Sequence, residues 1–228
     1  MPYAMGKKIL WMLLGVLGIF VIFFGVRVYW FVQELRNTHT PSGFTASRVD
    51  FREVILESQN ILVPQDAPSI GASQAALRVQ VFCDFQCPYC GAAYPIIREF
   101  VTRHQDQVQL VFRHFPNEES HPYAGVAAVA AECAKAQGMF WPYHDTLFQH
   151  QDQLDPTSLR QFAVRVGLKE KSFMQCVQDN GRKARVDQDL AEALKLGVRG
   201  TPTWFINGKK VEGVLPLHVW EEVLSKVK

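Results

Sequence analysis

Residues 82–90 read FCDFQCPYC, with three cysteines at the spacing C-x3-C-x2-C. This spacing fits two different chemistries. Three converging thiolates can hold an iron–sulfur cluster, as in radical enzymes that cleave S-adenosylmethionine. Alternatively, only Cys87-Pro88-Tyr89-Cys90 reacts, as a thiol–disulfide pair, and Cys83 is a neighbour without a role in the chemistry. The sequence on either side of the stretch bears on the choice.

The elements expected around the cysteines place Cys87 at the start of a helix. Residues 77–82 (LRVQVF) alternate and are rich in strand formers, residues 90–104 show helical spacing, and 108–116 (VQLVFRHFP) predict a second strand. Unpaired N–H groups at a helix N-terminus stabilise a thiolate. We therefore expect Cys87 to be exposed, with a lowered pKa, and to attack, while Cys90 is covered and resolves the mixed disulfide.

The rest of the chain is mainly helical and ends in a hairpin and a helix. Helical patterns run from about 121 to 197, separated by Gly, Asp-Pro and Asn-Gly breaks. TWFI at 203–206 then turns at Asn207-Gly208, and an amphipathic helix closes the chain. Residues 64–73 are expected to form a loop. The predicted order is β-α-β, a helical block, then β-β-α.

The N-terminal part predicts an uncleaved membrane anchor. Residues 9–26 carry no charge, and after Arg27 the apolar run continues to residue 32. This is long enough to span a bilayer core of about 30 Å, longer than the apolar region of a signal peptide, and it offers no small-x-small cleavage site. Lys7 and Lys8 on the short side predict a cytoplasmic N-terminus and an extracytoplasmic C-terminal part.

These patterns divide the chain into parts. We expect a cytoplasmic tail at 1–8, a transmembrane anchor at 9–32, a linker with a short helix at 33–63, and a catalytic domain at 64–228 with a helical insertion at about 121–197. The first 36 residues hold four of the 24 basic and one of the 22 acidic side chains, which leaves the rest with a net charge of −1. No basic patch emerges, so no nucleic-acid partner is expected.

The context favours disulfide chemistry over a cluster or a metal. An anchored chain of this orientation holds its cysteines in an oxidising compartment, where labile clusters are poorly suited to assembly. Only 138 residues follow Cys90, and they are organised as a helical block and a hairpin. A β/α barrel that carries an iron–sulfur cluster would need several more β-α units. Zinc would need a fourth ligand from a scattered His or Cys. We therefore expect no metal and no cofactor.

Five motifs together resemble the DsbA-like thioredoxin family, over roughly residues 60–227. They are VFCDFQCPYC at 81–90, Pro95, FRHFPNEESHPYA at 112–124, AAECAKAQGMFWPYHDTLF at 130–148, and GVRGTPTWFINGK at 197–209. The C-P-Y-C motif alone is not specific, because glutaredoxins carry it too. The resemblance implies an α/β thioredoxin fold with a helical insertion, which agrees with the element order.

The resemblance also implies roles for particular residues. Thr201-Pro202 is expected to be a cis-proline loop that faces the disulfide, where a substrate strand can pair beside Pro88 and Tyr89. Outside the cytoplasm, four of the five cysteines pair into two bridges, which leaves Cys83 odd. Related proteins with an extra bridge in the insertion imply a structural disulfide between Cys133 and Cys176.

Two positions depart from the family pattern. Val81 stands six residues before Cys87, where members commonly carry an acid that assists proton transfer to the buried thiol. Either Asp84, the nearest candidate, or water would have to replace that acid. Cys83 stands where a small polar residue is frequent. It is either an inert buried side chain or an alternative disulfide partner for Cys87.

The sequence therefore predicts a membrane-tethered, extracytoplasmic thiol–disulfide oxidoreductase that introduces disulfides into exported proteins through Cys87 and Cys90. Its expected partners are reduced exported polypeptides, a membrane protein that reoxidises or reduces the pair, and the bilayer around 9–32. An isomerase or reductase of the same fold is the alternative, since thioredoxin and DsbA potentials differ by about 150 mV on one scaffold. An iron–sulfur enzyme and a non-catalytic peptide-binding module are the remaining alternatives.

Overall fold

The computed structural model describes residues 23–29 and 63–227. The chain divides into two units, Met1–Ser47 and Arg48–Lys228. Residues 23–29 are helical, and within the described residues no helix has both the length and the apolar character needed to cross a membrane. The predicted tail, anchor and linker lie outside the described residues, apart from 23–29 and residue 63.

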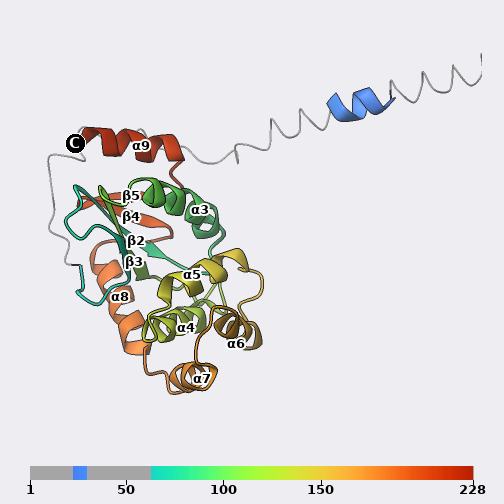
Figure 1. Ribbon diagram of the computed structural model, residues 1–228, viewed down its shortest axis with the longest axis vertical. Helices are drawn as coiled ribbons and strands as arrows, with labels where there is room; N and C mark the ends of the chain where they lie inside the picture. The colour runs from blue at the N-terminus through green and yellow to red at the C-terminus, as the bar shows by residue number, and fades with distance from the viewer. Residues whose placement is uncertain (1–22, 30–62, 228) are drawn as a thin grey trace, which may run out of the picture. The chain divides into compact units, whose positions relative to one another are not determined.

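The described part of the larger unit is built on a five-stranded mixed sheet (Figure 1). In spatial order the strands are β1 (Ser69–Gly71), β3 (Val108–His114), β2 (Leu77–Cys83), β4 (Thr203–Ile206) and β5 (Lys209–Glu212). The pair β2–β3 is parallel, which requires a crossover connection, and the other neighbouring strands are antiparallel. This is the α/β thioredoxin topology that the element order predicted.

The strand β1 corrects one expectation. Residues 64–73 were expected to be loop throughout, and the structure places a three-residue antiparallel partner of β3 among them. A strand this short shows no readable alternation, so its pairing with β3, and not its own sequence, defines it. Gly71 has a φ of +91°, and a Cβ there would lie 2.0 Å from the Val108 carbonyl oxygen, so glycine is required at the end of β1.

Helices cover both faces of this sheet. The crossover helix α3 spans Pro88–Arg103, and the insertion consists of α4 (Ala124–Lys135), α5 (Phe140–Gln149), α6 (Pro156–Arg165), α7 (Glu170–Gln178) and α8 (Lys183–Lys195). The last helix, α9 (Leu217–Lys226), lies beside α3 in Figure 1. The main core lies between the sheet, α3, α9 and the insertion, and a smaller core joins the sheet to α8.

Alternation along β2 directs its side chains to these two cores. Successive strand residues point to opposite faces, so Val79, Val81 and Cys83 share one face and belong to the main core. Phe82 points the other way, packs edge-on against Phe205 and belongs to the smaller core. The strand therefore delivers Val81 and Cys83 to the side that α3 covers.

A buried ion-pair network fixes α8 on the sheet. Arg113 of β3 is fully buried, and its guanidinium donates to Asp189 at 2.5 Å and to Glu192 at 2.6 Å, both on α8. Asp189 also accepts from the backbone N–H of His114 and pairs with Arg185 at 2.8 Å. A buried charge without a partner is costly, so these ion pairs favour one position of α8 on β3.

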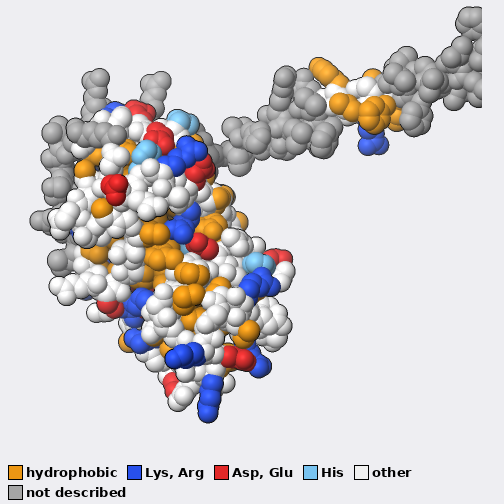
Figure 2. All heavy atoms as spheres, viewed as in Figure 1, with side chains coloured by type: hydrophobic (Ala, Val, Ile, Leu, Met, Phe, Trp, Pro, Cys, Tyr) orange, Lys and Arg blue, Asp and Glu red, His pale blue; other side chains and the backbone are white. Residues whose placement is uncertain are grey.

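The surface mixes charges of both signs. On the face shown in Figure 2, Lys and Arg side chains are interspersed with Asp and Glu, and hydrophobic side chains gather near its middle, where α3 and α5 lie in Figure 1. No single basic patch dominates this face.

A disulfide joins two helices of the insertion. Cys133 of α4 and Cys176 of α7 are bonded, with the sulfurs 2.02 Å apart and the residues 43 positions apart in the sequence. Cys133 is fully buried against the main core, whereas Cys176 lies at its margin. The bridge therefore ties the peripheral helix α7 to the helix that lines the core.

We expect a Cys133→Ser/Cys176→Ser variant of the full chain to lose up to about 4 kcal/mol of unfolding free energy, because closing a loop of this length restricts the unfolded chain. Denaturant titration in detergent, followed by tryptophan fluorescence, measures the loss. A variant within about 1 kcal/mol of the parent would show that the bridge does not stabilise the insertion.

Candidate active site

The helix α3 begins beside the first reactive cysteine. Cys87 is its N-cap, with extended backbone angles (φ −68°, ψ 121°), and Pro88 occupies the first helical position, where a missing N–H costs nothing. Cys90 lies one turn in and is 1% exposed. Pro88 and Tyr89, between the two thiols, are exposed to solvent. The dipeptide therefore faces outward while Cys90 faces the core.

The loop before β4 faces Cys87. Thr201-Pro202 is a cis peptide, and the Cys87 thiol donates a hydrogen bond to the Thr201 carbonyl oxygen at 3.3 Å, across 114 positions of sequence. Pro202 is buried and Thr201 half-buried. The fold thus brings together Cys87, Cys90, Pro88, Tyr89 and the Thr201-Pro202 loop, whereas Cys133 and Cys176 lie in the insertion and form their own bridge.

The cover over Cys87 differs from the expectation. An exposed thiol was predicted at the helix tip, but Cys87 is only 5% exposed. The reason is tertiary: the Thr201 loop lies against the N-terminus of α3, where its carbonyl oxygen accepts a hydrogen bond from the Cys87 thiol.

The two thiols of the reduced pair influence each other. Because they are hydrogen-bonded, a charge on one opposes a charge on the other. The hydrogen bond with Cys90, followed by burial, raises the pKa of Cys87, while the Thr201 side chain and the Cys90 backbone N–H act to lower it. Burial raises the pKa of Cys90. The lowered Cys87 pKa expected from the helix terminus is therefore not found in this state, because the neighbouring thiol and the cover outweigh the helix.

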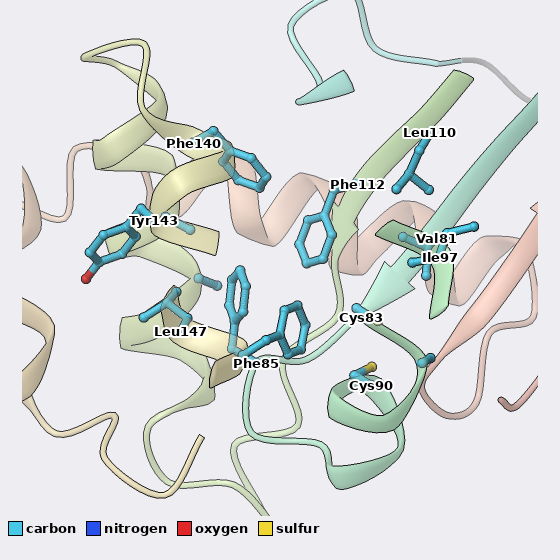
Figure 3. Close-up of a cluster of buried hydrophobic side chains, with 14 of the residues drawn as sticks. Val81, Cys83, Phe85, Cys90, Ile97, Leu110, Phe112, Phe140, Tyr143 and Leu147 are labelled. Carbon is cyan, nitrogen blue, oxygen red and sulfur yellow. The ribbon is translucent and has the colours of Figure 1, made fainter. Parts of the chain in front are cut away.

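Cys83 lies directly beneath the pair, on the face of β2 that α3 covers. Burial raises the pKa of the Cys83 thiol. Val81, Cys83, Cys90 and His144 line a cavity of about 20 Å³, which is room for about one water molecule. Figure 3 shows Cys83 at the end of its strand next to Cys90.

Asp84, one of the two candidates to replace the missing acid, uses its carboxylate to hold backbone groups. Its carboxylate is almost fully buried and accepts from the backbone N–H of Gln86 at 2.7 Å and of Asn117 at 2.9 Å, and it pairs with His121 Nδ1 at 2.7 Å. The part of Asp84 that reaches the sulfurs is its backbone N–H, which favours a thiolate at Cys83 or Cys90. The carboxylate anchors the strand-to-helix turn.

Phe85 anchors the same turn from the other side. It is 1% exposed and stacks on Phe112 with ring centroids 5.3 Å apart, and it lies 5.0 Å from Phe148 of α5. The five-residue stretch from Cys83 to Cys87 is therefore fixed by a buried carboxylate and a buried ring.

Gln151, in the turn after α5, is a site residue that the sequence did not indicate. Its side-chain amide donates to the carbonyl of Phe85 at 2.7 Å and to that of Cys87 at 3.0 Å. A Cβ on Gly91 would lie 1.9 Å from its Oε1, so glycine makes room for it. Only the tertiary fold joins these residues, since 64 positions separate Gln151 from Cys87.

The described residues contain no group of three or more His, Cys, Asp or Glu side chains arranged to hold a metal ion. What the site offers is three neighbouring thiols. Cys87 and Cys90 lie one helical turn apart at the start of α3, and Cys83 lines a cavity together with Cys90. The arrangement is suited to exchange between thiols and disulfides, in which a thiolate attacks one sulfur and displaces another.

Curated relatives of the chain are parts of longer proteins. It is 36% identical over 184 residues to the Na(+)/H(+) antiporter NhaA 3 of Salinispora tropica, which covers 81% of this chain and 28% of that protein. It is 35% identical over 198 residues to NhaA 1 of Salinispora arenicola, and the matched residues make up 86% of this chain and 30% of that protein. The chain thus spans less than a third of the length of these two relatives.

Solved structures share the fold. A thioredoxin-like oxidoreductase from Silicibacter pomeroyi DSS-3 is 27% identical, with a TM-score of 0.64 over 72% of this chain and 92% of that one. Oxidised BdbD from Bacillus subtilis is 22% identical, also with a TM-score of 0.64, over 71% and 92%. Wolbachia pipientis α-DsbA1 is 22% identical, with a TM-score of 0.64 over 73% of this chain and 93% of that one. At 22% identity, the likeness to BdbD and to α-DsbA1 concerns the fold alone.

The family model described as Thioredoxin matches residues 64–226, which is more than half of the chain. The chain therefore belongs to the thioredoxin family, which agrees with the predicted resemblance to its DsbA-like members.

Proposed function

We propose that the chain is a membrane-anchored, extracytoplasmic oxidoreductase that donates a disulfide to exported proteins through Cys87 and Cys90. The observation that carries the proposal is the position of Cys87 at the N-cap of α3, against the Thr201 carbonyl and one turn before the buried Cys90. The outer thiol is placed to meet a substrate and the inner thiol to leave.

The reaction would proceed in two exchanges. A substrate thiolate attacks Cys87 Sγ, the Cys87–Cys90 bond breaks, and its electron pair stays on Cys90. The Asp84 backbone N–H favours the charge there. A second substrate thiolate then attacks its partner sulfur in the mixed disulfide and releases Cys87, so the substrate is oxidised by two electrons and the pair is reduced. A membrane partner would reoxidise the pair.

Substrate binding would depend on the state of Cys87. In the reduced pair the Thr201 carbonyl accepts the Cys87 S–H. In the oxidised pair this proton is gone, so the carbonyl becomes available to a backbone N–H of an extended substrate segment. Pro88, Tyr89 and Pro202 would flank that segment. The oxidised form would therefore hold a reduced polypeptide better than the spent form holds its product.

The redox potential decides the direction. For the full chain in detergent, equilibrated with glutathione, we expect the Cys87–Cys90 pair to have a potential above about −150 mV, in the range of an oxidant. Quantitative alkylation of the thiols measures it. A value near −270 mV would contradict disulfide donation and favour a reductase.

Two single variants separate the roles of the thiols. In Cys90→Ser incubated with a disulfide-bonded substrate, the Cys87 thiolate should attack the substrate disulfide and remain in a mixed disulfide, because Cys90 is no longer there to resolve it. Non-reducing electrophoresis detects the adduct. In Cys87→Ser, oxidation of a reduced substrate protein should fall to the rate with glutathione alone. If Cys87→Ser kept the parent's rate, the assignment of the attacked sulfur would be wrong.

Membrane anchoring and orientation are testable with the full chain. We expect it to sediment with membranes and to resist extraction at alkaline pH, since residues 9–32 are predicted to span the bilayer. Alkaline phosphatase fused after residue 228 should be active, because it folds only when exported, while green fluorescent protein fused at the same position should not fluoresce, because it matures only in the cytoplasm. The opposite pattern would reverse the proposed topology.

Gln151 should position the reactive turn. Gln151→Ala removes two hydrogen bonds to the backbone of that turn, each worth about 1 kcal/mol, and should shift the redox potential of the pair and lower the midpoint of unfolding. Gln153→Ala, an exposed neighbour whose amide contacts only Asp152, is the control. Gly91→Ala should be destabilised, and Gln151→Ala should rescue it; without rescue the two residues do not interact as described.

A further inference from the structure

Cys83 is a buried nucleophile that the proposed reaction does not use. It is 5% exposed at the end of β2, and its carbonyl accepts from the Phe115 N–H at 2.9 Å, so its position is fixed by the sheet. Because it shares a strand face with Val79 and Val81, its thiol points beneath the first turn of α3. That is where Cys90 lies (Figure 3).

The positions of the three cysteines matter most. Cys83 and Cys90 line the same small cavity beneath α3, whereas Cys87 is the N-cap of α3 and contacts the Thr201 carbonyl. Cys90 therefore has Cys87 one helical turn before it and Cys83 beside it. In thiol–disulfide exchange the attacking and leaving sulfurs lie on opposite sides of the sulfur attacked, and we expect Cys83 and Cys87 to take these two places around Cys90.

We propose that Cys83 is a third redox-active cysteine, which replaces Cys87 as the disulfide partner of Cys90. The inference deepens the proposed function, since it requires the Cys87–Cys90 disulfide as its starting point. The Cys83 thiolate attacks Cys90 Sγ, the Cys83–Cys90 bond forms, the Cys87–Cys90 bond breaks, and the electron pair leaves on Cys87. The proton lost by Cys83 is balanced by proton uptake at Cys87, so no outside oxidant or reductant is needed.

The surroundings support charge at either inner sulfur. The Asp84 backbone N–H reaches both Cys83 and Cys90, and so favours the attacking thiolate before exchange. Cys83 and Cys90 belong to the main core, so the nearest partner for Cys83 is Cys90 of the same chain. The Asp84 carboxylate opposes ionisation of Cys83, as burial does, and the exchange should therefore be slow at neutral pH and faster as pH rises.

The exchange would change the chemistry that the site offers. It leaves Cys87 as a free thiol beside the Thr201 loop while the chain remains oxidised by two electrons. This thiol can attack a mispaired disulfide in a bound polypeptide. Cys90, bonded to Cys83, cannot resolve the resulting adduct, so the polypeptide's released thiolate has time to attack a second disulfide of the polypeptide. A thiolate freed there then attacks the polypeptide sulfur bonded to Cys87 and releases Cys87. The substrate class for this second activity is a polypeptide with incorrectly paired cysteines.

The test begins with Cys87→Ser in the full chain, which keeps Cys83 and Cys90 as its free thiols. After treatment with oxidised glutathione we expect loss of both thiols without bound glutathione, and a peptide pair linked through Cys83 and Cys90 in mass spectrometry. The matched Cys83→Ala/Cys87→Ser variant should instead retain one thiol or carry one glutathione. The proposal is wrong if Cys87→Ser behaves like this double variant while its tryptophan fluorescence matches that of the parent, which shows that it is folded. If Cys87→Ser misfolds, Cys87→Ala is used for the same measurement.

The oxidised parent chain supplies the second measurement. Iodoacetamide should slowly alkylate Cys87 in molecules whose Cys83 and Cys90 are joined by a disulfide. This alkylation should be faster at pH 9 than at pH 7, and it should not occur in Cys83→Ala. Equal alkylation in the parent and in Cys83→Ala contradicts the exchange. These outcomes are separate from the proposed function, because a chain that donates disulfides to substrate yet forms no Cys83–Cys90 link refutes only the further inference.

Discussion

One buried carboxylate holds the turn on which the chemistry depends. Asp84 follows the last residue of β2, and its two oxygens accept from the turn itself, from the backbone after β3 and from His121. With its side chain held in this way, its backbone N–H is aimed at the sulfurs. The strand end, the start of α3 and the segment after β3 therefore meet at a single anionic group, and the spacing of the three cysteines becomes a fixed arrangement.

The general fold and the position of the Cys87–Cys90 pair could be predicted because their signals are local. Alternation in 77–82, helical spacing after Cys90 and the turn residues Asn207-Gly208 each occupy a few consecutive positions, so periodicity and composition suffice to place the elements. The position of Cys87 at a helix start followed from the same patterns. Thr201-Pro202 is different, because its place opposite Cys87 came from the family resemblance and not from a pattern in the residues.

The features that escaped prediction depend on residues far apart in the sequence. The three residues of β1 are a strand only because β3 lies beside them. The cover over Cys87 comes from a loop 114 positions away, and Gln151 reaches the same turn across 64. Cys83 was considered as a partner for Cys87, but the fold sets it against Cys90 instead. Spacing along the chain shows which thiols are present, and only the packing of α3 on β2 shows which of them meet.

The bridge between Cys133 and Cys176 gives the chain a requirement of its own. Both cysteines are made as thiols, and their joining removes two electrons that some oxidant has to accept. In an oxidising compartment a newly made copy is thus a client of disulfide formation before it is a catalyst of it. If the proposed activity holds, an older copy of the chain could oxidise the new one, and the maturation of this protein and its activity would depend on the same oxidant.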